Sequence, residues 1–329
     1  MEFKDFFQNL TGYRISEIYI LLGKSGLIDI VKSYKNGASI DKICKSCNWD
    51  IETGGRFIEA LTHIEILEKK ENKFYPTQFA EMFFLKNSGN SQNESLNFED
   101  KLTKSWNTLE NVLKTGKRDF NTDDKDQASY ENSLKQYISA MDDAACIRST
   151  ELWDAIQIDT KGKILDVGAG SGAFLCEFLE RNINWKGIFC DLNDVIDIAK
   201  KNQRIMDLRD RISFHPCNLL DNPFANLEIR PDIILISNVI HCYNIDEIRV
   251  IFRHIQQIST DKTYVIIHDF FKDTSWHGAL YDIHMMLNTY SGKTYVTNEI
   301  IDILKECGFI HANVQTLSSY SAVITGSKE

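Results

Sequence analysis

The stretch KILDVGAGSGAFLCEFLE, from Lys163 to Glu180, decides the fold. Its first five residues are rich in apolar side chains and predict a short buried strand. Glycines at 168, 170 and 172 follow, and residues 173–181 form an amphipathic run that predicts a helix. Glycine permits sharp backbone turns and lets a ligand approach the main chain. The pattern therefore predicts a strand, a glycine turn and a helix, either as a ligand site or as a tight turn without a ligand.

The chain beyond residue 161 repeats this alternation. Further β-rich runs are KGIFCDL, RISFHPCN, DIILISNVI, TYVIIHDFF and SAVITGS, and the helical runs between them cover residues 194–206, 245–258 and 297–307. Strands that alternate with helices of this length predict a parallel, doubly wound sheet. We therefore expect an α/β fold with a Rossmann-like sheet in this part of the chain.

The N-terminal part has a different pattern. Apolar residues recur at helical spacing over residues 3–31. A short helix is expected from the N-cap Ser39 to Cys47, and a further helix is expected over 50–70. A turn, a short strand and a last helix follow up to residue 84, which is typical of a winged helix. We predict a mainly α, winged-helix-like domain over 1–97, a helical linker over 98–160 that contributes to a substrate pocket, and a ligand-binding domain over 161–329. In the linker, helices are expected at 98–113 and 131–156, with a polar segment between them.

Composition limits the class of protein. The chain of 329 residues is 43% hydrophobic and has a formal net charge of −10, which argues against nucleic acid or an anionic membrane as the main partner. No apolar run reaches the ~20 residues that span a bilayer, and MEFKDFFQNL lacks the apolar core of a signal peptide. The eight cysteines are scattered, which favours thiols in a reducing cytosol over a disulfide framework. We expect a soluble cytoplasmic protein.

Two carboxylates flank the glycine turn. Asp166 lies two residues before the first glycine, and Asp191 ends the next predicted strand, 19 positions past Gly172, where it can accept hydrogen bonds from ribose hydroxyls. A nicotinamide dinucleotide is the alternative ligand, but its usual loop is G-x-G-x-x-G and this loop is G-x-G-x-G. An acidic residue beside the turn repels a diphosphate and attracts a cation. This charge argument favours S-adenosylmethionine, which carries an ammonium and a sulfonium group.

ILDVGAGSG followed by FCDL resembles the motifs of class I S-adenosylmethionine-dependent methyltransferases. More narrowly, nearly the whole chain resembles the small-molecule O-methyltransferases of the caffeate and acetylserotonin types, through RISFHPCNLLDNPF, NVIHCYNIDE, ALYDIHMML and NEIIDILKECGF. The resemblance implies S-adenosylmethionine as cofactor, S-adenosylhomocysteine as product, a small, aromatic or polyketide-like acceptor hydroxyl, and a homodimer formed by the N-terminal domain.

The resemblance also implies a set of cofactor contacts. One position departs from the family: where relatives show Gly-Asp, with the aspartate on the adenine amino group, this chain has Cys217 and Asn218. An asparagine still offers a carbonyl oxygen as acceptor. The expected cofactor residues are Asp166, Gly168, Gly170, Gly172, Asp191, Leu192, Asn218, Leu219 and Asn238.

His241 occupies the position of the family's catalytic histidine, which implies a general base for the acceptor hydroxyl. Imidazole suits this task because its unperturbed pKa of about 6.5 lies near working pH. Asp269 matches a glutamate that orients the histidine in the plant enzymes. The family's Asp-Trp after the histidine is replaced by Cys242 and Tyr243. The alternatives are a histidine that only begins a helix and an acid that only ends a strand.

Four residues are expected to face the acceptor by the same resemblance. They are Met141, Asp142, Met285 and Thr289. Methionine is also a common filler of helix cores, so the alternative for Met285 is internal packing. The acceptor itself is not readable from the sequence, and methylation of N, S or C, or a relative without methyl transfer, stays open.

Two other classes of function are considered. A winged helix can bind DNA, but residues 50–70 carry Glu52, Glu59, Glu65 and Glu68, and such an acidic face repels phosphates. Apolar residues of RISEIYILL and IEALTHIEIL instead predict a dimer interface. Cys44 and Cys47 form a single C-x-x-C pair without a second one, so no metal site is expected.

Overall fold

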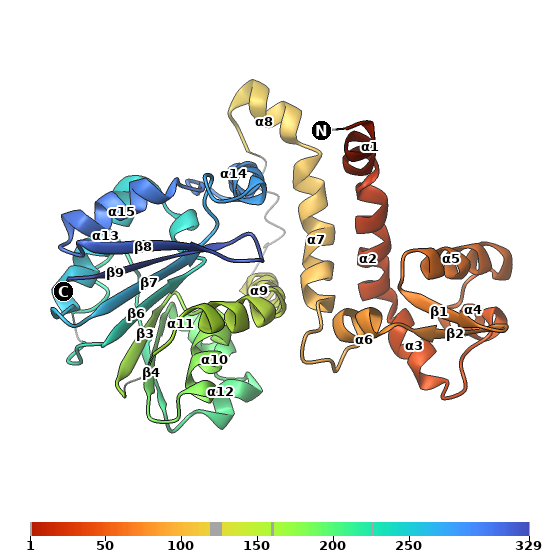
Figure 1. Ribbon diagram of the computed structural model, residues 1–329, viewed down its shortest axis with the longest axis horizontal. Helices are drawn as coiled ribbons and strands as arrows, with labels where there is room; N and C mark the ends of the chain where they lie inside the picture. Colours follow the sequence, from red (N-terminus) through yellow and green to blue (C-terminus); the bar gives the residue numbers. More distant parts are fainter. Residues whose placement is uncertain (1, 119–126, 159–160, 226, 329) are drawn as a thin grey trace. The chain divides into compact units, whose positions relative to one another are not determined.

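The structure is a computed structural model that describes residues 2–118, 127–158, 161–225 and 227–328. The chain divides into two compact units, Met1–Thr103 and Lys104–Glu329 (Figure 1). The sequence predicted three parts instead. The expected boundary between residues 97 and 98 falls inside one helix, α7 (Asn93–Trp106). Residues 119–126 of the expected linker and residues 159–160, next to the second boundary, lie outside the described residues, and the division into three parts stays a prediction.

The first unit is built from helices and one small sheet. Its other elements are α1 (Phe3–Thr11), α2 (Tyr13–Ser25), α3 (Leu27–Ser33), α4 (Ile40–Cys47), α5 (Ile51–His63), β1 (Leu67–Lys70), β2 (Lys73–Pro76) and α6 (Gln78–Phe84). The expected N-cap Ser39 precedes α4. The helix predicted over 50–70 is too long: α5 ends at His63, Glu65 has a positive φ of 60°, and the rest of the segment forms β1, which pairs antiparallel with β2.

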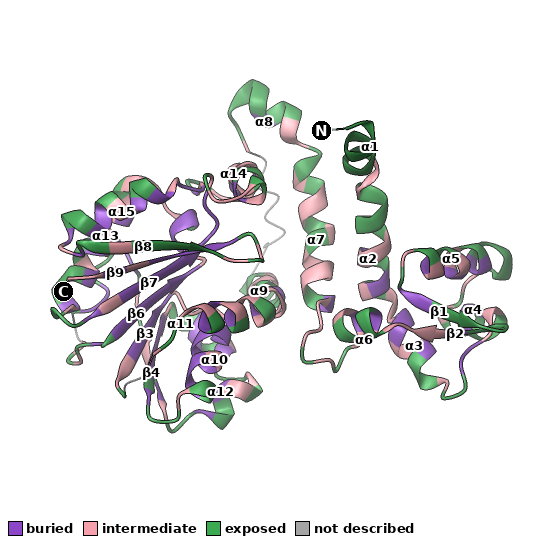
Figure 2. Cartoon of the chain, viewed as in Figure 1, coloured by how far each residue is buried: buried purple, intermediate pink, exposed green. Residues whose placement is uncertain are grey.

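The core of this unit corrects one expectation. Ile58, Leu61 and Ile66, from the segment predicted to face a partner chain, are each 0% exposed and pack inside the unit. Their spacing marks the inward face of α5 and the start of the hairpin, because an isolated small unit must bury such a stripe in its own core. The other predicted segment does carry exposed apolar side chains, since Ile15 and Leu21 of α2 are 38% and 40% exposed. Further exposed apolar side chains lie on α1, which has no buried residue (Figure 2).

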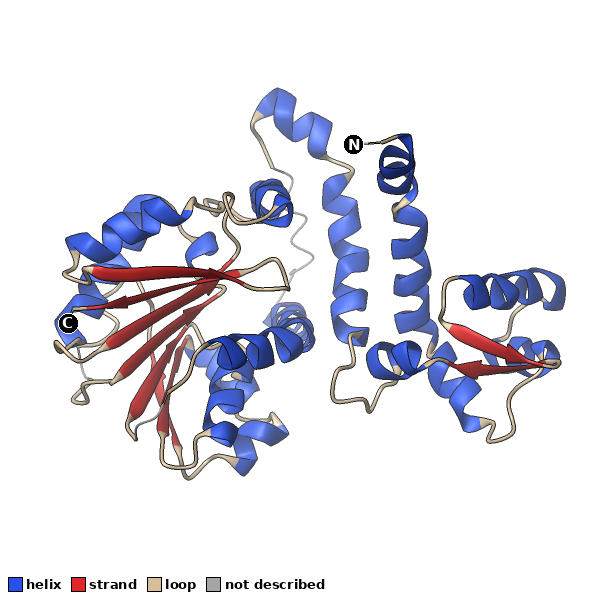
Figure 3. Ribbon diagram, in the orientation of Figure 1, coloured by secondary structure: helices blue, strands red, loops and turns tan. Residues whose placement is uncertain are grey.

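The second unit contains a seven-stranded sheet in the order β5-β4-β3-β6-β7-β9-β8 (Figure 3). The first five strands of this order pair in parallel, whereas β9 pairs antiparallel with both β7 and β8. This confirms the predicted doubly wound sheet. The strands are β3 (Lys163–Val167), β4 (Lys186–Asp191), β5 (Ile212–Pro216), β6 (Ile233–Ser237), β7 (Tyr264–Asp269), β8 (His311–Thr316) and β9 (Ala322–Ser327).

Helices cover both faces of this sheet. Besides the end of α7, the second unit contains α8 (Leu109–Thr115), α9 (Gln127–Ala155), α10 (Ala173–Arg181), α11 (Asn193–Ala199), α12 (Gln203–Asp207), α13 (Ile245–Ile258), α14 (Trp276–Asn288) and α15 (Thr297–Glu306), with a 3₁₀ turn η1 (Ile240–Cys242). The helix predicted over 194–206 is two helices, because Asn202 caps α12 with its side chain. The one predicted over 98–113 is likewise divided between α7 and α8.

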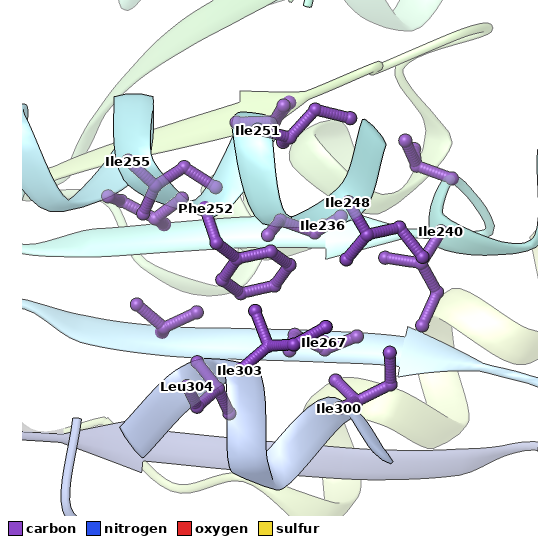
Figure 4. Close-up of a cluster of buried hydrophobic side chains, with 14 of the residues drawn as sticks. Ile236, Ile240, Ile248, Ile251, Phe252, Ile255, Ile267, Ile300, Ile303 and Leu304 are labelled. Carbon is purple, nitrogen blue, oxygen red and sulfur yellow. The ribbon is translucent and has the colours of Figure 1, made fainter. Parts of the chain in front are cut away.

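Two apolar clusters hold the layers together. On one face α13 and α15 pack on β6 and β7, with Phe252 and Ile303 among the buried side chains (Figure 4). On the other face α9, α10, α11 and α12 pack on the sheet around Phe178 and Phe189. Because both faces of β6 are buried, its sequence is an almost continuous run of apolar residues. No helix among the described residues combines the length and apolar character needed to cross a membrane.

One disulfide departs from the expectation, which favoured thiols over a disulfide framework. Cys190 of β4 is bonded to Cys217, which follows β5, and their Cα atoms are 6.2 Å apart. The two strands pair in parallel, and Cys217 N donates to Asp191 O at 2.9 Å, so strand register brings the cysteines together. Spacing along the sequence does not reveal such a pairing. The remaining six cysteines are free.

Candidate active site

The glycine turn lies at the carboxyl end of β3, between that strand and α10. Gly168, Gly170 and Gly172 have φ values of 71°, 58° and 82°, in the left-handed region that favours glycine. A Cβ on Gly168 would lie 2.7 Å from Val239, and one on Gly172 2.8 Å from Ile205, so these two glycines allow close packing. A Cβ on Gly170 would meet nothing within 4 Å. Gly170 is therefore the member of the turn that borders open space.

Asp166 lies beneath this turn, in the middle of the parallel sheet. Its side chain is 2% exposed, and its Oδ2 has no hydrogen-bond partner. Burial, followed by the charge of Asp191, raises the pKa of Asp166 to about 8. A buried polar atom without a hydrogen-bond partner costs free energy unless a ligand supplies one. The site therefore favours a cationic ligand and disfavours an anionic one.

Asp191 ends β4 beside the turn. Gly170 N donates to its Oδ2 at 2.8 Å, and Leu192 N donates to its Oδ1 at 2.7 Å. Burial raises the pKa of Asp191, and these two backbone donors oppose that shift. The carboxylate is thus fixed next to Gly170, with further acceptor capacity for a sugar hydroxyl. Leu192 itself is 52% exposed.

The other expected cofactor residues have different surroundings. Asn218 is exposed, and its Oδ1 accepts from Leu220 N at 3.2 Å in a local turn. Leu219 is 6% exposed and packs in the apolar cluster under β4 and β6. Asn238 follows β6 with a φ of 55° and donates to Ser237 Oγ. Their roles as cofactor contacts stay predictions.

His241 and Asp269 are brought together by the parallel pairing of β6 and β7. The distance from His241 Nδ1 to Asp269 Oδ1 is 2.6 Å, and the side chains are 7% and 1% exposed. Since a carboxylate only accepts, Nδ1–H donates, and once the ring is neutral Nε2 keeps its lone pair. Burial is the largest single influence and opposes the protonated form. The charges of Asp269, Tyr281 and Cys242, with the hydrogen bond to Asp269, together outweigh it and raise the pKa of His241 well above its usual range.

An aromatic ring of α14 contacts the histidine, and two further rings of that helix stack on the first ring. The Tyr281 ring meets His241 edge-on, with centroids 5.3 Å apart, and also contacts Phe270 at 4.5 Å. Tyr281 stacks on His284 at 5.3 Å and on His277 at 6.1 Å, so the three side chains form one stripe of the helix. We call His277, Tyr281 and His284 the ring stripe. Burial lowers the pKa of His284 to about 4, which leaves it neutral.

The residues expected to face the acceptor do not form one group. Asp142 of α9 accepts from Asn202 at 3.2 Å and interacts with Ser171, which places it at the glycine turn. Met141 is half-buried on the same helix. Met285 is 5% exposed, and the Thr289 hydroxyl donates to Met285 O at 2.7 Å. Of the residues after the histidine, Cys242 is exposed and Tyr243 packs against the core.

Sequence reasoning missed the ring stripe and one more aromatic residue. His277, Tyr281 and His284 are spaced at i, i+4 and i+7, a helical stripe that could have revealed them. Tyr137 of α9 lies close enough to Cys242, Tyr281 and His241 for their charges to act on it, and burial raises its pKa. Tyr137 precedes Met141 by one helical turn, so the helical period of α9 places it on the same face.

A sheet of this order, with an acid-flanked glycine turn at the carboxyl end of β3, defines a class I methyltransferase. Residues 120–310, more than half of the chain, match the O-methyltransferase domain family, and the chain belongs to that family. S-adenosylmethionine is therefore the cofactor, and the protein is an O-methyltransferase. The buried, unpartnered carboxylate of Asp166 and the open space at Gly170 suit this cationic nucleoside.

Named relatives agree with this assignment. The chain is 21% identical to acetylserotonin O-methyltransferase of Gallus gallus over 340 residues, which cover 98% of this chain and 96% of the relative. It is 25% identical over 182 residues to 3-hydroxy-5-methyl-1-naphthoate 3-O-methyltransferase of Streptomyces sahachiroi, covering 53% and 52%. The solved structure of human N-acetylserotonin methyltransferase in complex with SAM has a TM-score of 0.86 at 14% identity, covering 99% of this chain and 97% of that one.

Proposed function

We propose that this O-methyltransferase methylates a hydroxyl group of a small aromatic or polyketide-like molecule, with His241 as general base. The observation that carries the proposal is the 2.6 Å hydrogen bond between His241 and Asp269. It fixes the tautomer with a free Nε2, which takes the proton that the acceptor hydroxyl loses. When bound, S-adenosylmethionine supplies the methyl group and leaves as S-adenosylhomocysteine.

The cofactor residues follow from the same site. Asp166 and Asp191 would hold the cationic and ribose parts of the nucleoside, while the glycine turn gives its main chain close access. Leu192 and Asn218 follow the two strand ends that the disulfide joins, and Asn238 begins the turn toward His241. Asp142, which lies at Ser171, is a candidate for the cofactor side of the site.

The ring stripe supports an aromatic acceptor. The Tyr281 ring beside the proposed base, with the two rings stacked on it, offers stacking and edge contacts that favour a planar substrate. The name of the Streptomyces relative describes a hydroxylated naphthoate as its substrate. Met141, Met285 and Thr289 remain candidates for the edge of this acceptor site.

The first unit is proposed to form a homodimer, and its three helices α3, α4 and α5 with the hairpin β1–β2 suit a winged-helix domain. Phe3, Phe6, Phe7 and Leu10 of α1 are 79%, 53%, 50% and 59% exposed and repeat at i, i+3, i+4 and i+7. A second copy of the chain would cover such a stripe. We do not expect nucleic acid to bind, because of the acidic residues on and after α5.

A cytoplasmic location stays part of the proposal. The six free cysteines suit a reducing compartment, whereas the Cys190–Cys217 disulfide does not.

The proposal is tested with an acceptor panel. Wild-type protein and His241→Asn are incubated with S-adenosylmethionine and hydroxylated aromatic compounds or their amino analogues, and methylated products are identified by mass spectrometry. We expect methyl ethers from the wild type and little product from the variant, while both bind S-adenosylhomocysteine in calorimetry. Methylation by His241→Asn at the wild-type rate would refute the base.

A further inference from the structure

A second buried histidine, His268, lies next to the proposed catalytic pair. It is 0% exposed and precedes Asp269 on β7. Its Nδ1 is 2.8 Å from Ser237 Oγ, and its Nε2 is 2.9 Å from Ser321 Oγ. Ser237 ends β6, and Ser321 directly precedes β9. One imidazole therefore links three neighbouring strands at the edge of the sheet that carries the site.

The link continues into the turn that carries His241. Asn238 donates from Nδ2 to Ser237 Oγ at 3.2 Å and from its backbone N to His268 O at 2.8 Å. Its φ of 55° lies in the left-handed region, which an asparagine adopts only at some cost. Since His241 follows three residues later, the main chain and side chain of His268 both hold the start of this turn.

The hydrogen bonds have a consistent direction. Burial lowers the pKa of His268 to about 4, although Asp269 and Glu151 oppose this and Arg148 adds to it, so the ring is neutral. A neutral imidazole has one donor and one acceptor. Because Ser237 Oγ accepts from Asn238, its proton is available to Nδ1, and Nε2–H then donates to Ser321. Both ring nitrogens are thereby satisfied without a charge.

The far end of the network is also fixed. Ser321 Oγ is 2.9 Å from Ser319 Oγ, and Ser319 N donates to the carboxylate of Glu151 on α9 at 3.2 Å. The Phe174 ring of α10 packs against the His268 ring at 5.1 Å. The imidazole thus has little freedom to move, as a residue that positions others requires.

We propose that His268 is a positioning residue for methyl transfer: through Ser237 and Asn238 it holds the turn that places His241 against Asp269. The inference rests on the proposed role of His241 as base. Without this link, the His241–Asp269 distance lengthens. His241 remains surrounded by Asp269 of β7, Tyr281 and His284 of α14, Tyr137 of α9 and Cys242 beside it. Of these groups, Asp269 makes the hydrogen bond that a misplaced turn would lose.

The test compares three variants of the full chain. His268→Leu removes both hydrogen bonds at similar volume. His268→Asn keeps a polar group near the position of Nδ1 and can still bond Ser237. Thr263→Val is the matched control, since Thr263 is 0% exposed and donates to Pro231 O at 2.9 Å at the opposite end of β6 and β7. The pKa of His241 is measured by NMR with labelled histidine, and its signal is assigned with His241→Asn.

We expect a lower His241 pKa in His268→Leu and values near the wild type in His268→Asn and Thr263→Val. With an acceptor in hand, kcat of His268→Leu falls about 10- to 100-fold, with little change in the acceptor KM. The proposal is overturned if His268→Leu and Thr263→Val give the same His241 pKa. If His268→Leu does not fold, Ser237→Ala takes its place with the same two outcomes.

This readout separates the two proposals. The NMR titration needs no acceptor, so it works even if no methylated product is found. A His241 pKa that does not change in Asp269→Asn would refute the coupled pair, and with it the proposed base, whatever His268 does.

Discussion

His241 Nδ1 lies 2.6 Å from Asp269 Oδ1, and both side chains are buried. The two residues are 28 positions apart in the sequence and meet because β6 and β7 are parallel neighbours whose carboxyl ends lie at one edge of the sheet. Ligands of open α/β sheets bind at that edge. The pair therefore combines a fixed tautomer with a location beside the cofactor turn.

Asp269→Asn is expected to slow catalysis and move its pH dependence. In the wild type, kcat rises with pH as His241 loses its proton, at a pH well above the ordinary 6.5. Without the carboxylate, the largest influence that opposes burial is gone and the pKa of the histidine falls, so the rise moves to lower pH. The maximal kcat falls about 100-fold or more, because the amide can hold the wrong tautomer. Asp269→Glu, which keeps the acceptor, is the control and retains more activity; equal pH profiles for both variants would contradict the argument.

Asp166 is expected to make the free protein less stable as pH rises. Its folded pKa is about 8, against about 3.9 in an unfolded chain. Between these values the folded state binds more protons than the unfolded state, so the free energy of unfolding falls with increasing pH. Asp166→Asn removes this contribution to the pH dependence of stability. Thermal unfolding from pH 5 to 9 should show the wild type losing stability relative to the variant, and parallel curves would refute the shift.

Cofactor binding should release a proton from the same residue. A cation next to Asp166 favours its ionised form, so binding of S-adenosylmethionine near pH 7 expels a proton that the free protein holds. Calorimetry in two buffers of different ionisation enthalpy measures this release. We expect it in the wild type and a smaller release with weaker binding in Asp166→Asn. Equal release by both proteins would assign the proton to another group.

Much of the fold was predictable because its signals are local. Residues 173–181 and 245–258 were predicted as helices with the limits that α10 and α13 have. The strand β8 was missed because HANVQT is mostly exposed and lacks both an apolar run and an alternating pattern. The Cys190–Cys217 bond was missed because it depends on which strands become neighbours. Pairing between distant segments leaves no local pattern in a single sequence.

The site was predictable only in part for the same reason. The glycine turn is local, and the positions of His241 and Asp269 came from the family resemblance, yet their contact depends on the strand order. The location of Asp142 at Ser171 and the ring stripe over His241 required the packing of α9 and α14. The role of His268 could not be anticipated, since its partners Ser237 and Ser321 lie 31 and 53 residues away.

Gly170→Ala and Gly172→Ala should separate binding from folding. Both residues have positive φ, where a Cβ is disfavoured, so each substitution should lower the free energy of unfolding by about 1–2 kcal/mol. A Cβ at residue 172 would also lie 2.8 Å from Ile205 and 3.0 Å from Phe189, so Gly172→Ala should lower the free energy of unfolding by about 1–3 kcal/mol more. Denaturant unfolding measures this difference. Gly170→Ala should stay folded but bind S-adenosylhomocysteine more weakly, because its Cβ occupies the open side of the turn; wild-type affinity would show that the cofactor lies elsewhere.

The exposed stripe of α1 should determine the oligomeric state. Phe6 and Phe7 are 53% and 50% exposed on a helix with no buried residue, so a charged side chain there leaves the fold of the unit intact. Sedimentation velocity should show a dimer for the wild type and a monomer for Phe7→Asp. Ile183→Asp is the control, because Ile183 is an apolar residue of the second unit that is 79% exposed. A dimeric Phe7→Asp would place the interface outside α1, whereas dissociation in both variants would mean that added charge, and not the stripe, separates the chains.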